Sequence, residues 1–210
     1  MKEYTLTELK NIAKKLRRDV ISMISGAGSG HPGGSLSAAD IVTALYFSVM
    51  KHDPKNPKWP DRDRFILSKG HAAPILYAAL AECGYFPSEW FSTLRKTGTC
   101  LQGHTDSRLT PGVDVSAGSL GQGLSVGVGM AIAAKLDKKD FHTYVLLGDG
   151  ECEEGQVWEA ALCAPNFKLD NLTAIVDLNG LQLDGFTKDI MNMDPVVEKW
   201  KSFNWQVVEI

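Results

Sequence analysis

The sequence lacks the features of a secreted, disulfide-stabilised or nucleic-acid-binding protein. Residues 1–20 carry charges throughout and contain no apolar segment of a signal peptide. A formal net charge of −3 leaves no excess of positive charge for nucleic acid or an anionic membrane. No CxxC pair or zinc-ligand spacing occurs among the cysteines, which are Cys83, Cys100, Cys152 and Cys163. We therefore expect a cytoplasmic protein with reduced thiols, which has neither nucleic acid nor membrane as a partner.

The sequence also lacks a strongly apolar run that would cross a membrane. Its one long uncharged run, residues 115–134, is interrupted by serines and a glutamine. Gly123 and Gly127 stand in this run at a spacing that closely packed helices use. We expect the run to form a buried helix, with its small residues at a contact between subunits and Gly127 at the centre of that contact.

What the sequence does contain is an alternation of apolar strands and helices, with no repeat, low-complexity tract or linker. We therefore treat residues 1–210 as a single domain. This order is typical of an α/β fold, a mostly parallel sheet with helices on both faces. The expected strands span residues 64–68, 143–147, 172–178 and 206–210, and the expected helices 5–25, 36–50, 73–83, 88–96, 120–136, 156–163 and 195–203.

Three segments with polar residues or glycines come directly after expected strands. They are His71, the Gly-Asp-Gly of residues 148–150, and Asn179. In parallel α/β sheets, ligands bind beyond the carboxyl ends of the strands. The sequence therefore predicts a ligand site at that edge.

A GxGxxG pattern at Gly28, Gly30 and Gly33 does not mark a dinucleotide site. Such a site needs a strand before the first glycine and a helix that opens within the motif. Here a helix precedes the pattern, and Pro32 stands inside it. What remains is a loop that carries His31.

The stronger pattern is Asp149 followed, after Gly150 and a gap of 28 residues (151–178), by Asn179. One helix and one strand fit in the gap, and a crossover of this kind makes the two strand ends neighbours. Carboxylate and amide oxygens suit Mg²⁺ or Ca²⁺. Gly150 allows a diphosphate to approach the main chain, where the following helix adds N–H donors.

These residues, read with their surroundings, resemble the transketolases among the thiamine-diphosphate enzymes. The resemblance rests on six ordered blocks between about residues 25 and 185: SGHPGGSLSAAD, SKGHAAPILYA, QGHTD, SAGSLGQGLS, GDGECEEGQVWEA and LNGLQLDG. It implies a thiamine-diphosphate-binding fold and the transfer of a two-carbon ketol unit between sugar phosphates. Deoxyxylulose-phosphate synthase, E1-type dehydrogenases and a non-catalytic cofactor-binding subunit remain as alternatives.

The resemblance implies a role for each of several residues around the cofactor. Asp149, Asn179 and the main-chain oxygen of Leu181 would bind the metal, with Mg²⁺ expected and Ca²⁺ or Mn²⁺ as alternatives. Gly150 and His71 would contact the diphosphate. The remaining cofactor contacts would come from Gly118 and Leu120 near the aminopyrimidine and from Leu183 against the thiazolium.

The resemblance also implies catalytic and interface residues. His31, His71 and His104 would line the substrate channel and move protons of the sugar hydroxyls, a task that suits imidazoles. Glu154 and Glu159 would lie at a dimer interface, in a carboxylate network that couples two active sites. For Glu154 a solvated position at a helix start remains equally open.

Four further titratable residues are expected to be solvated. Glu151 and Glu153 stand at a helix start, where the dipole favours acidic side chains. His52 and His142 have no glycine-rich context and are interpreted as surface residues.

The resemblance further implies parts that this sequence does not contain. A pyrimidine-binding domain, sugar-phosphate ligands and a histidine after residues 206–210 are missing, so the fold is expected to lack its C-terminal end. A split subunit and a truncated chain are both consistent with this. We expect a partner subunit that carries the pyrimidine domain, a homodimer or heterotetramer, and no activity of the isolated chain.

Overall fold

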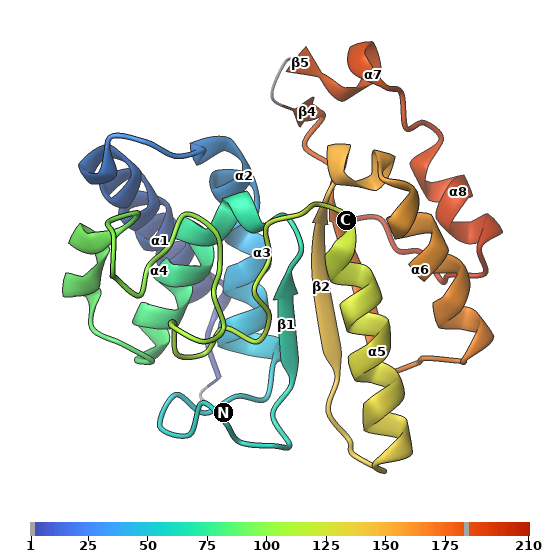
Figure 1. Cartoon of the computed structure of the whole chain (residues 1–210), viewed down its shortest axis with the longest axis horizontal. Coiled ribbons are helices and arrows are strands. Elements are labelled where there is room, and N and C mark those ends of the chain that lie inside the picture. The colour runs from blue at the N-terminus through green and yellow to red at the C-terminus, as the bar shows by residue number, and fades with distance from the viewer. Residues whose placement is uncertain (1–2, 183–184) are drawn as a thin grey trace.

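The centre of the molecule is a parallel sheet, which confirms the expected α/β fold. The computed structural model describes residues 3–182 and 185–210. Within them, three strands pair in the order β1-β2-β3: β1 (Arg64–Leu67), β2 (Thr143–Gly148) and β3 (Leu172–Asp177). Because these strands are continuous apolar runs, they are covered on both faces, as Figure 1 shows.

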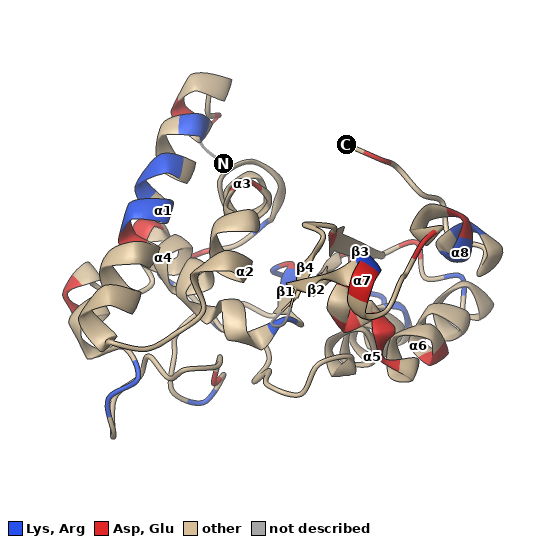
Figure 2. Cartoon of the chain, turned by 90° about the horizontal axis from the view of Figure 1, so that it is seen from above, with Lys and Arg blue, Asp and Glu red and all other residues tan. Residues whose placement is uncertain are grey.

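One face of the sheet carries the helices of the amino-terminal half, with a core around Leu16, Val20 and Tyr77. A capping box begins the first helix, since the side chains of Thr5 and Glu8 each accept from the other's backbone N–H. Lys and Arg gather along the first helix (Figure 2). The elements of this layer are α1 (Leu6–Ala27), α2 (Pro32–Ser37), α3 (Ala39–Ala44), a π-helical turn (Leu45–Val49), α4 (Ala73–Cys83) and two 3₁₀ turns (Gly70–Ala72, Ser88–Thr93).

The other face carries the helices of the second half, with a core around Leu124, Val157 and Trp200. Its elements are α5 (Gln122–Leu136), a 3₁₀ turn (Gly150–Glu153), α6 (Gly155–Asn166) and α8 (Val196–Ser202). Beyond β3 follow a two-stranded antiparallel ladder and a short helix, namely β4 (Leu181–Gln182), β5 (Gly185–Phe186) and α7 (Thr187–Ile190).

The structure departs from the expected elements at several places, of which three concern the extent of predicted strands and helices. Residues 206–210 form no strand, since within the described part of the chain no neighbouring strand pairs with them. The second helix begins at Pro32 rather than at residue 36, because proline is favoured at a first helical position. Residues 88–93 form a 3₁₀ turn instead of a longer α-helix.

Gly123 and Gly127 of α5 face the sheet, while Gly129 is exposed, so the expected subunit contact at Gly127 was wrong. A Cβ atom at Gly127 would lie 2.5 Å from Cγ2 of Val145, and one at Gly123 would lie 2.3 Å from Oγ of Ser68. The small residues therefore let the helix approach β1 and β2. Within residues 3–182 and 185–210, no helix has the length and apolar character needed to cross a bilayer.

Candidate functional site

The ends of β2 and β3 bring Asp149 and Asn179 together, as the gap between them predicts. Gly148 and Asp177 pair across the ladder, so the residues that follow leave the sheet side by side. Asp149 is 3% exposed, and its Oδ2 accepts from the backbone N–H of Gly180 at 2.7 Å. Its Oδ1 accepts from the N–H of Gly150 at 3.0 Å.

The oxygen atoms at this turn suit a hard divalent cation. Asp149 supplies a carboxylate, Asn179 an exposed amide whose Oδ1 accepts from the N–H of Leu181 at 2.9 Å, and Leu181 a main-chain oxygen. No cluster of three or more His, Cys, Asp or Glu with metal-binding geometry occurs among the described residues. A metal here would therefore rest on one carboxylate and neutral oxygens, and would depend on phosphate oxygens to complete its shell.

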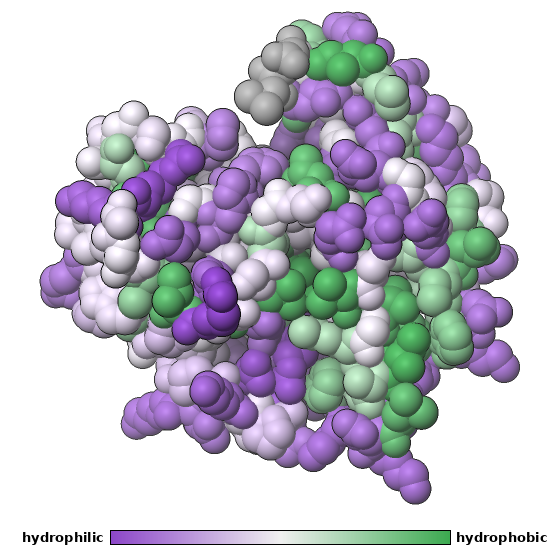
Figure 3. Space-filling model, in the orientation of Figure 1, coloured by the Kyte–Doolittle hydropathy of each residue, from purple (hydrophilic) through white to green (hydrophobic). Residues whose placement is uncertain are grey.

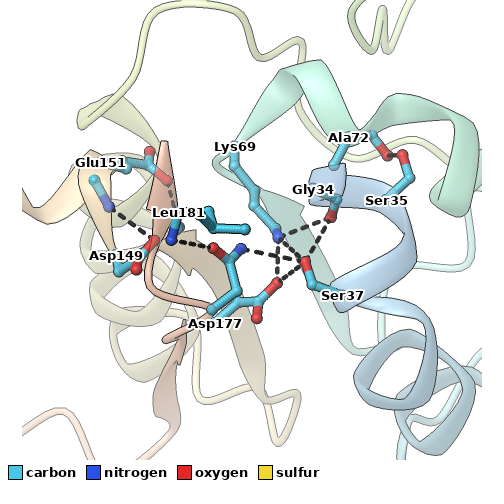
Figure 4. A network of polar contacts seen from close by, with 12 residues as sticks. Gly34, Ser35, Ser37, Lys69, Ala72, Asp149, Glu151, Asp177 and Leu181 are labelled. Atoms are coloured by element: carbon cyan, nitrogen blue, oxygen red, sulfur yellow. Dashed lines mark hydrogen bonds and ion pairs between the residues drawn. The ribbon is translucent and has the colours of Figure 1, made fainter. Parts of the chain in front are cut away.

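A buried lysine joins this turn to the first half of the chain (Figure 4). Lys69, which is 1% exposed, follows β1 and forms an ion pair with Asp177. Its Nζ also donates to the main-chain oxygen of Gly34 at 2.8 Å. Ser37 of α2 donates to Asp177 at 2.6 Å. This network holds the ends of β1 and β3 against α2, and sequence reasoning missed it because an isolated lysine has no spacing signature.

The three predicted histidines converge on one pocket. Gly30, His31, His71, Pro74, Leu94, Arg95, Gly103 and His104 line it. The rings of His31 and His71 lie 6.1 Å apart, edge to face. The buried Tyr77 supports the third histidine, because its hydroxyl lies within hydrogen-bond distance of the main-chain oxygens of Gln102, at 3.0 Å, and His104, at 3.1 Å. Segments far apart in the sequence thus present three imidazoles to the same space.

The environment of His71 keeps its imidazole neutral at physiological pH. Burial lowers the pKa of His71 to about 4, and the nearby charges of Lys69, His31 and His104 act in the same direction. A neutral imidazole has one nitrogen that donates and one that accepts a hydrogen bond. His71 is therefore suited to donate or accept a hydrogen bond as a neutral group rather than to pair with an anion as a cation.

Arg95 is a pocket residue that the sequence did not reveal. Its backbone φ is +62°, and its guanidinium lies beside Gly30 and Gly103, where added Cβ atoms would come within 3.5 and 3.0 Å of it. The two glycines are neighbours of His31 and His104. Arg95 therefore fills the space between two histidine-bearing loops, a position that a lone basic residue in a loop does not signal.

The loop before α5 approaches the same edge. A Cβ atom at Gly70 would lie 2.7 Å from the main-chain oxygen of Ala117, and one at Gly118 would lie 3.8 Å from the ring of His104. Gly118 is exposed and Leu120 is half-buried, so of these two only Gly118 is shown to lie near a pocket histidine. Leu183, which was predicted to lie against the thiazolium, falls outside the described residues.

The acidic run after Asp149 does not behave as expected. Glu151 is 3% exposed rather than solvated, because its carboxylate meets donors of other segments. Burial raises its pKa, against the hydrogen bonds and the charge of Lys69. Glu153 is half-buried and accepts from the side chain of Gln182 at 2.9 Å. Glu154 and Glu159 are exposed. Exposure in the single chain is consistent both with a subunit interface and with a solvated helix face.

The two histidines without a predicted role are not surface residues either. His52 is half-buried, with its ring nitrogens 3.0 Å from the hydroxyl of Tyr85 and 2.7 Å from the main-chain oxygen of Tyr46. His142 is half-buried and lies 2.8 Å from Oγ1 of Thr173. Both support the fold away from the pocket.

A parallel sheet with oxygen ligands, close-approaching glycines and a histidine-lined pocket at its carboxyl edge defines a cofactor-binding α/β domain. Residues 8–210 match the family model described as transketolase, thiamine diphosphate binding domain. The chain belongs to the transketolase family, within its thiamine-diphosphate-binding domain.

Individual relatives place the chain more closely. It is 49% identical over 203 residues to the 6-deoxy-6-sulfo-D-fructose transketolase subunit SqwG of Clostridium sp. (strain MSTE9), covering 97% of this chain and 74% of the relative. It is 46% identical to an apulose-4-phosphate transketolase subunit of Phocaeicola vulgatus, covering 94% and 70%. The chain spans about a third of the full-length human transketolase, at 44% identity over 97% of its own length.

Solved structures agree with the fold. A transketolase variant from Pichia stipitis superposes with a TM-score of 0.91 at 37% identity, covering 96% of this chain and 31% of the other. The transketolase from Leishmania mexicana gives 0.91 at 33% identity, covering 96% and 32%. The chain therefore corresponds to about a third of each of these solved transketolase chains.

Proposed function

We propose that this chain is the diphosphate- and metal-binding subunit of a split transketolase that moves a two-carbon ketol unit between sugar phosphates. The observation that carries the proposal is the convergence of three histidines in one pocket, one of them, His71, from the same edge of the sheet as the Asp149–Asn179 turn. Two relatives that the chain covers to 70% or more are themselves named transketolase subunits, which favours a split enzyme.

The residues at the turn would hold the cofactor by its diphosphate and metal. Asp149, Asn179 and the main-chain oxygen of Leu181 would bind Mg²⁺, while Gly150 and the neutral His71 would contact the diphosphate. The bound thiamine diphosphate supplies the carbanion chemistry. Ca²⁺ or Mn²⁺ in place of Mg²⁺ would satisfy the same oxygen ligands.

The pocket would bind the reacting end of the sugar. The pocket is lined by His31, His71 and His104. His31 and His104 would accept and return the protons of sugar hydroxyls, and the neutral His71 would hold these hydroxyls by hydrogen bonds. Gly118, whose added Cβ atom would lie 3.8 Å from the ring of His104, and Leu120 in the same loop would contact the aminopyrimidine. The geometry thus provides binding, orientation and proton transfer from separate loops.

The second half of the chain presents an apolar surface that suits a partner polypeptide. Apolar side chains lie exposed along α5 and α6 (Figure 3), with Val126 38%, Leu136 77% and Leu162 62% exposed. Such a surface on an α/β domain favours an interface. We propose that a second chain with the pyrimidine-binding domain completes the site, in a homodimer or heterotetramer to which Glu154 and Glu159 contribute carboxylates.

The test is reconstitution. The purified chain is assayed with a ketose phosphate, an aldose phosphate, thiamine diphosphate and Mg²⁺, alone and with the candidate partner subunit. We expect turnover only in the mixture, and we expect His104→Asn to reduce it at least tenfold while His52→Asn, away from the pocket, leaves it within about twofold. Turnover by the chain alone, or none with any candidate partner that forms a complex, would contradict the proposal.

A further inference from the structure

Glu151 joins three separate segments at the carboxyl edge of the sheet. Its Oε1 accepts from the hydroxyl of Ser68 and from the N–H of Gly121, the latter at 2.9 Å, and its Oε2 accepts from the N–H of Gly148 at 3.0 Å. Every one of these donors comes from a different segment. The carboxylate is 3% exposed, so water does not compete for these bonds.

The carboxylate of Glu151 also caps the N-terminus of α5. The first N–H groups of a helix have no partner within the helix, and α5 has no side-chain cap of its own. Instead, the N–H of Gly121 donates to Glu151, and the N–H of Gly123 donates to Oγ of Ser68 at 3.1 Å. Because Ser68 in turn donates to Glu151, both N–H groups depend on this carboxylate.

Each donor borders a segment that the proposed function places at the cofactor. Ser68 precedes the turn that carries His71, Gly121 follows the loop of residues 118–120, and Gly148 begins the segment that contains Asp149. The main chain before α5 is tightly fitted here, since Gly121 has a φ of +81° and a Cβ atom at this position would lie 2.8 Å from Cβ of Glu154. A shift of one segment would therefore move the others.

We propose that Glu151 is a positioning residue that holds the three cofactor-binding segments at fixed spacing before the cofactor arrives. The proposal rests on the proposed function for the identity of the ligand. Glu151 itself would not touch the cofactor or metal, because both of its oxygens face protein donors. Its role is to preorganise the loops, so that binding does not spend free energy on ordering them.

The variant that tests this is Glu151→Gln. The amide keeps the size of the side chain but replaces one oxygen with an N–H₂ group, which cannot accept from Gly148 or Gly121. A buried N–H is then left facing another donor. Glu153→Gln is the matched control, because Glu153 lies in the same turn and accepts only from the side chain of Gln182.

The first measurement is hydrogen exchange of the chain without cofactor. We expect the amides of residues 118–123 and 148–150 to exchange about tenfold faster in Glu151→Gln and to be unchanged in Glu153→Gln. Ser68→Ala removes one of the hydrogen bonds to Glu151, so it should increase the exchange rates of the amides of residues 121–123 by a smaller factor. If Glu151→Gln does not fold, Ser68→Ala carries the measurement. Unchanged exchange at residues 118–123 would overturn the proposal.

The second measurement is the affinity of the assembled complex for thiamine diphosphate with Mg²⁺, by calorimetry. We expect about tenfold weaker binding for Glu151→Gln. Val20→Ala, in the core on the other face of the sheet, serves as a variant of matched lower stability and should bind normally. If Val20→Ala weakened cofactor binding as much as Glu151→Gln does, Glu151 would contribute only to overall stability, and the proposal would be overturned. If the wild-type complex binds no cofactor, the proposed function fails, while the exchange measurement still decides about Glu151.

Discussion

The two edges of the sheet both bury carboxylates, yet they do so for different purposes. At the amino edge, Asp63 is 4% exposed and accepts from the N–H groups of Lys51 and His142 at 2.7 and 2.8 Å. Asp114 pairs with Arg62 and accepts from the N–H of a β1 residue. These carboxylates tie loops to strand starts, and the histidine pocket lies at the opposite edge.

At the carboxyl edge, Asp149 is as buried as Asp63, but it accepts from the N–H of Gly180 in the turn that carries the exposed Asn179. A buried acidic group, or one with a shifted pKa, therefore does not by itself mark a functional site, since structural networks bury charges as well. The surroundings of the carboxylate distinguish the two cases. At the amino edge the carboxylates bind only loops and strand starts, whereas at the carboxyl edge glycines and exposed oxygen atoms lie close to Asp149. Substitutions at each edge can separate these two roles.

The largest effect is expected from Asp114→Ala at the amino edge. It leaves the guanidinium of Arg62, whose side chain is 17% exposed, without its partner, and it removes an acceptor of the N–H of Phe65. Loss of one member of a buried pair costs about 3 kcal/mol of unfolding free energy. Urea denaturation measures this cost, and calorimetry should find the cofactor affinity of the folded complex unchanged. A weaker affinity would mean that the two edges are coupled.

Asp149→Asn should show the opposite behaviour. The amide is close in shape to the carboxylate but lacks its charge, so metal-dependent affinity for thiamine diphosphate should fall by about 100-fold, or about 2.7 kcal/mol. The unliganded chain should also lose some stability, because one oxygen that accepts from the N–H of Gly150 or Gly180 is replaced by a donor. Asp63→Asn is the matched control and should leave the affinity unaltered. Titration of the complexes by calorimetry would refute the assignment if Asp149→Asn bound as tightly as the wild type.

The pH dependence of stability should distinguish the histidines of the two edges. The folded-state pKa of His71 is about 4, below its ordinary value of 6.5, so between these values only the unfolded chain binds the proton. Stability therefore falls as pH drops from about 6.5 to 4, by about 1.5 kcal/mol after allowing for solvent screening. Melting curves at pH 7 and 4.5 should show a smaller drop in His71→Asn. An unchanged drop would assign the pH dependence to other groups, such as His142, whose pKa burial also lowers.

The strands of the sheet could be predicted from the sequence because burial on both faces requires continuous apolar runs, such as those around Ile66 and Val145. The predicted strand at residues 206–210 failed because an extended apolar segment becomes a strand only where a neighbour offers a free edge. Periodicity describes one segment at a time and carries no information about that neighbour. The same reason explains the wrong expectation for Gly127. The sequence shows that this residue is small, but it does not show which surface packs against it.

For the candidate site, too, some residues could be predicted from the sequence and others could not. The strand-end rule placed Asp149 and Asn179 from their spacing alone, whereas the convergence of His31 and His104 was expected only from the resemblance. Glu151 was misjudged because the N–H groups that donate to it include that of residue 121, which is distant in sequence. Local rules for helix starts assign a glutamate in a first turn to solvent. Only the packed structure shows which helix it caps.

The smallest effects provide the sharpest comparison between the edges. Thr173→Val removes the hydroxyl that lies 2.8 Å from His142, and Ser37→Ala removes one that donates to Asp177. Each loss should lower the unfolding free energy by about 1 kcal/mol, because each removes one partly buried hydrogen bond. Only Ser37→Ala should also weaken cofactor binding, by a few-fold, since its hydroxyl lies 3.4 Å from the amide of Asn179. Denaturation and calorimetry on both variants measure the two quantities. Equal affinities in the two variants would contradict this expectation. They would show that loss of one hydroxyl at the carboxyl edge does not disturb the cofactor site, and that the contacts of Lys69 and Asp149 are sufficient to hold it.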